Sequence, residues 1–253
     1  MIVDAHMHIG RWDHPDFLGR SCSVADAVAV MRQAGVDGAL MAPTDRCDNQ
    51  GLLDEMRATL AAGFAGPLWF VAWVRPGTEQ LDWIEAQRGA VAGIKVHPSL
   101  HRTRVTDAGF APALELADRL GLLVLVHCGR WQQMASYRFA VEAAARHRGA
   151  RFLLAHAGGD TPPLATAAAE LLAERGLDNV WFEISGLREY WVVERNVGLL
   201  GAGRYLMGSD YNLAHPLSYV GAVRGMALDE AQRRGILGDN ARAVLGAPLC
   251  LDS

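Results

Sequence analysis

The sequence has few cysteines and no run of basic residues. Its four cysteines, Cys22, Cys47, Cys128 and Cys250, lie far apart and form no CxxC pair, which argues against disulfides and thiolate zinc knuckles. Lysine and arginine number 24 against 28 aspartate and glutamate, a formal net charge of -4. Without a basic tract, the chain is not expected to bind nucleic acid or an anionic membrane.

Long apolar segments are also missing. No uninterrupted apolar run reaches the length that spans a bilayer, and Asp4, His6 and His8 stand where a signal peptide would need an apolar stretch. We therefore expect a cytoplasmic protein. Hydrophobic residues still make up 51% of the chain, which is enough to fill a sizeable core.

Short apolar runs recur roughly every 25 to 35 residues, the spacing of a strand followed by a helix. The runs cover residues 1–7, 37–43, 67–74, 92–98, 122–129, 151–159, 179–186 and 204–211. Most are nearly continuous, as parallel strands covered on both faces are. Eight such units in about 250 residues are typical of an α/β fold of the (β/α)8 TIM-barrel type, so we predict a single domain over residues 1–253. An open doubly wound sheet is the alternative, but its glycine-rich first turn is missing.

Residues with capping preferences mark several helix ends. Ser23 and Asp26 form a capping pair before a helical pattern that Gly35 closes. Thr78 is expected to cap a helix over residues 79–89. These signals place helices between the strand-like runs, as the barrel requires.

Polar residues interrupt the apolar runs near their carboxyl ends. They are His6 and His8 in the first run, Lys95 and His97 in the fourth, His127 in the fifth, His156 in the sixth and Asp210 in the eighth. In a barrel these ends open onto one face, where catalytic groups gather. Side chains two residues apart on a strand share a face, so His6 and His8 can converge on one metal ion. One such histidine alone would more often be a hydrogen-bonded structural residue, but their joint placement favours a metal site.

Five segments in order, DAHMH, VHCG, AHAGG, MGSDY and ILGDNARAVLG, make the chain similar to the amidohydrolase superfamily. The similarity is greatest to the branch of aminocarboxymuconate semialdehyde decarboxylase and related hydrolases, and it covers nearly the whole chain. It implies a barrel enzyme in which His6, His8, His127 and Asp210 hold one divalent ion, zinc in the first place and manganese as the alternative. His156 matches a histidine that is a ligand in some members and orients substrate in others. Members are often dimers, so a homodimer is an expected partner.

Lys95 has two interpretations. The segment AGIKVHPS resembles one in binuclear members, where the lysine is carboxylated and bridges two metals, and also one in members without such a bridge. An unmodified ammonium, paired with a carboxylate or bound to an anionic substrate, is the commoner solution for a buried lysine, so we favour one ion over two. His97 either contacts substrate or packs before the turn at Pro98.

The ligand set indicates the reaction class. An ion held by three histidines and one aspartate keeps a positive charge and can lower the pKa of a water to about 7. Asp210 can take the proton as the water attacks a carbonyl carbon, and His156 can donate a hydrogen bond to the oxyanion. This describes a metal-dependent hydrolase of an amide, lactone or similar bond in a small molecule. The alternatives are a non-oxidative decarboxylase, in which Asp210 protonates carbon, and a metal-free lactonase.

Residues that follow the strands are candidates for substrate contact. Arg130, directly after VHCG, is the best candidate to bind a substrate carboxylate, and Trp12 is a candidate to cover a planar body. A solvated arginine and a tryptophan that only seals a loop are the alternatives. Cys128 should point away from the neighbouring histidine into the core. Glu183 and Ser185 share a face in the seventh run, where they either satisfy the barrel interior or shape the pocket.

Overall fold

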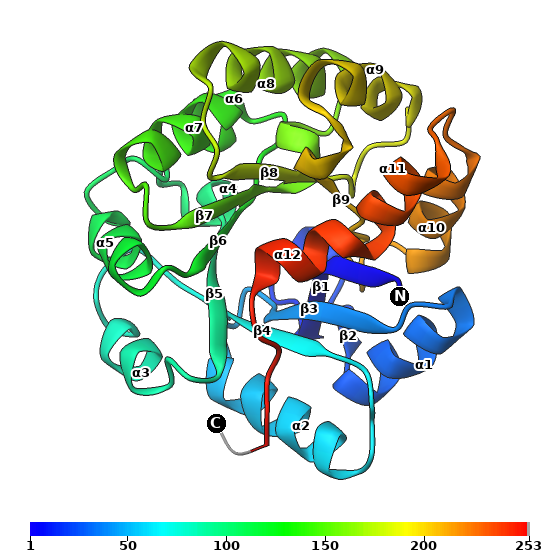
Figure 1. Cartoon of the computed structure of the whole chain (residues 1–253). Coiled ribbons are helices and arrows are strands. Elements are labelled where there is room, and N and C mark those ends of the chain that lie inside the picture. Colours follow the sequence, from blue (N-terminus) through cyan, green and yellow to red (C-terminus); the bar gives the residue numbers. More distant parts are fainter. Residues whose placement is uncertain (252–253) are drawn as a thin grey trace.

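The computed structural model describes residues 1–251, and a curled sheet of nine strands forms its centre (Figure 1). The strands are β1 (Val3–Arg11), β2 (Ser21–Cys22), β3 (Gly38–Pro43), β4 (Leu68–Trp73), β5 (Val91–Val96), β6 (Leu123–Val126), β7 (Arg151–Leu154), β8 (Val180–Glu183) and β9 (Tyr205–Leu206). Their order in the sheet is β2-β1-β3-β4-β5-β6-β7-β8-β9. Every pairing is parallel except that of β1 with β2.

The two ends of the parallel sheet meet through backbone hydrogen bonds between β1 and the segment after β9. Ala5 N donates to the carbonyl of Met207 at 2.9 Å, and Asp210 N donates to the carbonyl of His6 at 2.8 Å. The eight parallel strands therefore form the predicted (β/α)8 barrel, and each of the eight strand-like runs of the sequence overlaps one of them. The closing bonds also bring Asp210, at the end of the chain's last strand, beside the histidines of its first.

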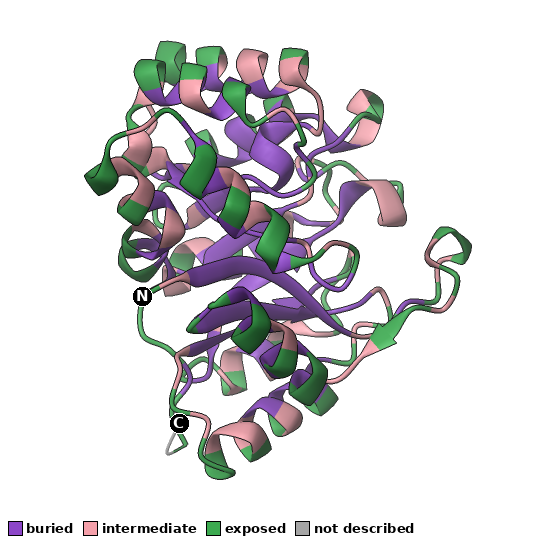
Figure 2. Cartoon of the chain, turned by 90° about the vertical axis from the view of Figure 1, so that its right-hand side faces the viewer, coloured by how far each residue is buried: buried purple, intermediate pink, exposed green. Residues whose placement is uncertain are grey.

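Helices surround the barrel and cover the outer faces of the strands (Figures 1 and 2). They are α1 (Val24–Ala34), α2 (Asn49–Ala61), α3 (Leu81–Ala86), α4 (Pro98–His101), α5 (Ala111–Leu120), α6 (Gln132–Ala135), α7 (Tyr137–Arg146), α8 (Pro162–Arg175), α9 (Trp191–Leu200), α10 (Pro216–Gly225), α11 (Glu230–Arg234) and α12 (Asn240–Leu245). Figure 2 shows the strands buried and the outer helix faces exposed, which explains why the strands are apolar on both faces. Among residues 1–251, every helix is too short or too polar to cross a membrane.

The amino end of the barrel is filled by apolar side chains and plugged by α12 (Figure 1). Ala241, Val244 and Leu245 of this helix pack with inward-facing residues such as Val3 and Leu123. The C-terminal segment therefore packs against the barrel. Because this end is closed, a pocket between the strands can open only at the carboxyl end, where the polar residues lie.

Two local predictions need correction. The Ser23 capping box and the left-handed Gly35 bound α1 as predicted, but the helix expected after Thr78 begins only at Leu81. Leu81 N donates to the Thr78 carbonyl at 3.1 Å, so a turn separates Thr78 from the helix. The sequence analysis also missed β2, because β1 continues beyond the histidines and folds back on Ser21–Cys22 as an antiparallel ribbon.

Candidate active site

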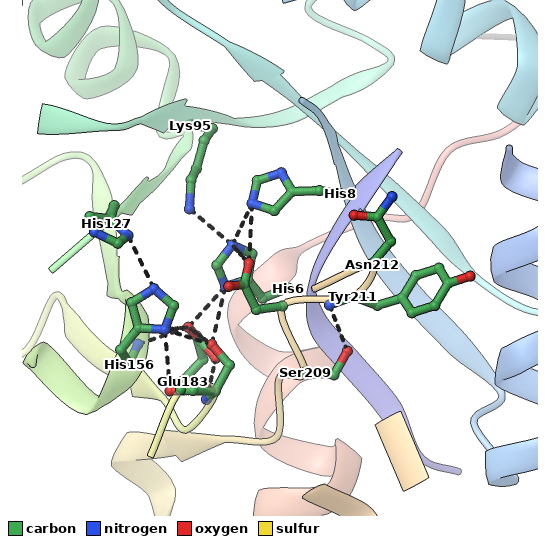
Figure 3. Close-up of polar contacts among 12 residues, drawn as sticks. His6, His8, Lys95, His127, His156, Glu183, Ser209, Tyr211 and Asn212 are labelled. Carbon is green, nitrogen blue, oxygen red and sulfur yellow. Dashed lines mark hydrogen bonds and ion pairs between the residues drawn. The ribbon is translucent and has the colours of Figure 1, made fainter. Parts of the chain in front are cut away.

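His6 and His8 lie in the middle of β1, in the second half of its pairing with β3, and their imidazoles face each other (Figure 3). Their exposed fractions are 0% and 2%, and their Nε2 atoms are 3.0 Å apart. The alternation of the strand puts both rings on the same side, as predicted. Burial, together with neighbouring positive charge, holds the pKa of each ring well below its usual value, so both are neutral near pH 7.

Hydrogen bonds at the Nδ1 atoms fix which nitrogen of each ring carries the proton. His6 Nδ1 donates to Glu183 Oε1 at 2.9 Å, and His8 Nδ1 donates to the Pro43 carbonyl at 3.0 Å. A neutral imidazole has one proton, so both Nε2 atoms carry lone pairs. Two lone pairs that face each other at 3.0 Å repel unless a cation lies beside them.

Asp210 supplies the third ligand atom from the segment that follows β9. Its backbone is left-handed, with φ 58°, an uncommon conformation for a non-glycine residue that aspartate adopts more readily than most. Asp210 Oδ1 lies 3.4 Å from Nε2 of both His6 and His8. The ligand atoms of these three residues all lie within 4.8 Å of one another.

The dimensions of this triangle fit a metal ion. Zn²⁺ binds histidine nitrogen and carboxylate oxygen at about 2.0–2.2 Å, so two ligands at angles between 90° and the tetrahedral value stand about 3.0–3.5 Å apart. The three edges measured here are 3.0, 3.4 and 3.4 Å. The paired lone pairs and the carboxylate thus form a donor set of the right chemistry and spacing for a divalent cation.

Lys95 enters the same site from β5. It is fully buried, and its Nζ donates to His6 Nε2 at 2.9 Å. Burial lowers the pKa of Lys95, while the carboxylates of Asp210 and Glu183 oppose this change. Burial also raises the pKa of Asp210, and Lys95 counteracts it. The ammonium and the carboxyl group are therefore coupled, and each limits the cost of burying the other.

A second histidine group lies beside the first (Figure 3). His156 sits in the 3-10 turn η2 (Ala155–Gly158), and its Nε2 is 3.1 Å from His127 Nδ1. The His127 ring stacks on His97 with 3.9 Å between centroids, and His97 stacks on Trp73 at 5.5 Å. Burial lowers the pKa of all three histidines. His127, predicted as a ligand, lies outside the close group of His6, His8 and Asp210, and its role stays a prediction.

Glu183 is the residue whose importance the sequence analysis missed. It ends β8, is fully buried, and its carboxylate connects His6 to the His156 turn. The available signal was an acidic residue inside an apolar strand, since a buried carboxylate needs several donors. Ser185 is one of them, with Oγ at 2.8 Å from Glu183 Oε1.

A cavity of about 290 Å³ opens over this site. Its lining consists of His8, Trp12, Phe17, Lys95, His97, His127, Arg130, His156, Asp160, Gly186, Asp210 and Leu213. Trp12 is buried and donates through Nε1 to Asn212 Oδ1 at 2.8 Å. Arg130 lies at the mouth, 74% exposed, with Nε 2.7 Å from Asp160 Oδ2. All the predicted substrate-binding residues therefore line one cavity, whereas Cys128 is in the core, as expected.

Comparison with known proteins agrees with this arrangement. The family model described as amidohydrolase matches residues 3–247. No curated protein sequence matches the chain. Three solved structures share the fold over nearly their whole length. An amidohydrolase from Burkholderia multivorans with bound zinc is 21% identical, with a TM-score of 0.76, and the match covers 98% of this chain and 100% of that one. A probable 2-pyrone-4,6-dicarboxylic acid hydrolase from Acinetobacter baumannii is 14% identical, with a TM-score of 0.73 and coverage of 97% of this chain and 99% of that one. For 5-carboxyvanillate decarboxylase from Sphingomonas paucimobilis the identity is 16%, the TM-score 0.72, and the coverage 96% of this chain and 98% of that one.

Proposed function

The chain belongs to the amidohydrolase family, and from this premise we propose that it is a metal-dependent hydrolase of a small, carboxylate-bearing molecule. The observation that carries the proposal is the triangle of His6, His8 and Asp210 at the floor of the cavity. We propose zinc as the ion of this site, because imidazole and carboxylate donors suit zinc. We propose the cytoplasm as the compartment of the protein.

His6, His8 and Asp210 are the residues that would hold the ion. When bound, it supplies Lewis acidity and lowers the pKa of a water toward neutrality. Asp210 lines the cavity and takes the proton from the water that attacks a carbonyl carbon, then returns it to the leaving group.

Lys95 and Arg130 are the cations that face the substrate. In this structure Lys95 donates to the His6 Nε2 lone pair. An ion bound at this nitrogen would take the lone pair, and the N–H groups of Lys95 would then be available to a carboxylate or a developing oxyanion in the cavity. Arg130 binds Asp160 through Nε, and within residues 1–251 its two terminal nitrogens are left to bind a carboxylate in a two-pronged contact.

His156 is proposed to act by orienting His127. Its Nδ1 lies 3.2 Å from the Ser185 carbonyl, and its Nε2 faces His127. Both nitrogens are occupied, so the geometry favours a positioning role over the hydrogen bond to an oxyanion that the sequence analysis assigned. His127 in turn faces the substrate from the cavity wall.

A decarboxylase is the second candidate, and the shared fold with 5-carboxyvanillate decarboxylase supports it. In such a reaction Asp210, which lines the cavity, would protonate the carbon that loses carbon dioxide. A metal-free lactonase is the third, supported by the Lys95 ammonium, which already donates to one of the facing lone pairs.

Metal analysis and a substrate panel test these proposals together. Protein purified without chelator should contain about one equivalent of zinc or manganese, and chelation should abolish turnover. Amides, lactones and aromatic carboxylic acids are assayed in parallel for bond cleavage and for carbon dioxide release. Carbon dioxide release alone would replace the hydrolase with the decarboxylase, and full activity after metal removal would support the metal-free lactonase.

A further inference from the structure

The carboxylate of Glu183 accepts four hydrogen bonds. Oε1 accepts from His6 Nδ1 at 2.9 Å, from the backbone N–H of His156 at 2.9 Å and from Ser185 Oγ at 2.8 Å. Oε2 accepts from the backbone N–H of Ser185 at 2.8 Å. A carboxylate only accepts, so this environment is built for an anion, and the four bonds fix its position.

The backbone on the far side leaves room for this carboxylate. A Cβ added at Gly208 would overlap Glu183 Oε2 and would lie 3.2 Å from Glu183 Cδ and from His6 Cβ. Glycine at 208 is therefore required for the close approach of β8 to the end of β9. The carboxylate does not line the cavity, so it is placed to hold other side chains and not to contact a substrate.

Its first effect is on the metal side of the site. By accepting from His6 Nδ1, Glu183 holds the proton on that nitrogen and leaves the Nε2 lone pair directed at His8 and Asp210. A carboxylate in this position also makes the imidazole a more basic ligand. Together with Asp210 it supplies two negative charges, which oppose the positive charges of the Lys95 ammonium and of a divalent ion.

Its second effect is on the histidine pair that faces the cavity. The η2 turn places His156 and Ala157 in left-handed backbone, with φ 57° and 53°, and the bond from His156 N to Glu183 stabilises it. The bond from Ser185 N orients the Ser185 peptide, whose carbonyl accepts from His156 Nδ1 at 3.2 Å. The Ser185 hydroxyl gives its one proton to Glu183 Oε1, so its oxygen also accepts from His156 Nδ1, at 2.9 Å. His156 Nε2 is then an acceptor, His127 Nδ1 must be the donor, and His127 Nε2 is left with a free lone pair.

We propose that Glu183 is a positioning residue that sets the protonated nitrogen of three imidazoles, those of His6, His156 and His127. One buried anion on β8 thereby prepares both the metal ligand and the histidine that faces substrate. The part that concerns His6 rests on the proposed metal site, whereas the part that concerns His156 and His127 does not.

Nitrogen-15 NMR of the histidine side chains in metal-free wild-type protein tests the assignment directly. All three rings should show the Nδ1–H form. An Nε2–H form of His6 or His156 overturns the proposal. This measurement needs no variant, so it stands even if a substitution at the buried position prevents folding.

Zinc titration of metal-free protein against a chromophoric chelator tests the consequence. Glu183→Gln should weaken zinc binding by about 10–100-fold, the usual effect of losing a carboxylate that supports a ligand histidine. The matched control is Glu55→Gln on α2, a partly buried carboxylate that accepts a backbone N–H from Val24 far from the site, and it should bind zinc like wild type. Equal affinity of Glu183→Gln and wild type overturns the proposal. If wild-type protein binds no zinc, the proposed function is contradicted instead. The part of the proposal that concerns His156 and His127 is then tested by the NMR result alone.

Discussion

Replacing Gly208 by alanine is expected to displace the Glu183 carboxylate without removing it. The new methyl group would overlap Oε2 and lie 3.2 Å from the carboxyl carbon, whereas apolar contacts are most favourable at about 3.5–4.0 Å. The carboxylate must retreat by roughly 1 Å, because the backbone that carries residue 208 is hydrogen bonded to β1 on one side. The bonds to His6 at 2.9 Å and to Ser185 at 2.8 Å would then exceed hydrogen-bonding distance.

The cost follows from these losses. Overpacking a well-filled interior costs about 1–3 kcal/mol, and a hydrogen bond to a charged group contributes about 1.5–3 kcal/mol. The carboxylate relieves the overlap by giving up these bonds, so the two costs do not add in full, and we expect the free energy of unfolding to fall by about 3 kcal/mol. For a chain of this length that corresponds to a decrease in Tm of about 6–12 °C.

Thermal unfolding followed by circular dichroism measures this decrease, and zinc titration measures the weaker binding that accompanies it. Gly221→Ala in α10 is the matched control, since a Cβ there meets nothing within 4 Å. It should leave Tm unchanged or raise it slightly, because alanine is the better helix former. If Gly208→Ala melted within 1 °C of wild type and bound zinc equally well, the account of Glu183 as a tightly held anion would be wrong.

Three further predictions concern the site as a whole. The double substitution His6→Ala with His8→Ala should remove the metal and abolish turnover. The far-ultraviolet circular dichroism should stay that of a folded barrel. One equivalent of zinc bound to this variant would contradict the ligand assignment. Burial lowers the pKa of the site histidines, so the unfolded chain binds more protons than the folded protein once the pH falls below about 6.5. The free energy of unfolding measured in urea should therefore decrease from pH 7.5 to pH 5.5. An unchanged value would mean that these rings are not buried and neutral. Arg130→Gln should raise KM by about tenfold with Tm unchanged, because its ion pair with Asp160 is 74% exposed at the arginine and contributes little to folding; an unchanged KM would remove Arg130 from substrate binding.

The barrel was predictable because its strands are buried on both faces, which leaves an apolar run for each of them in the sequence. Polar residues stood out against these runs, and His6, His8 and Asp210 were selected for that reason. The antiparallel ribbon of β2 was not predictable, since two residues carry no periodic signal. Thr78 failed as a cap because a threonine also starts an ordinary turn.

The finer arrangement of the site depends on distances that a sequence does not contain. His156 and Ala157 have left-handed backbone, and the His156 ring contacts His127. Alanine gives no signal for this conformation in the sequence. The role of Glu183 arises from donors supplied by three separate segments of the chain, and its importance appears only when these segments meet.

A crystal structure of protein purified from zinc-supplemented medium, with diffraction recorded on both sides of the zinc absorption edge, tests the central claim most directly. The account predicts one anomalous peak at bonding distance from His6 Nε2, His8 Nε2 and Asp210. A map with no peak at these three atoms, from protein that is active, would contradict it.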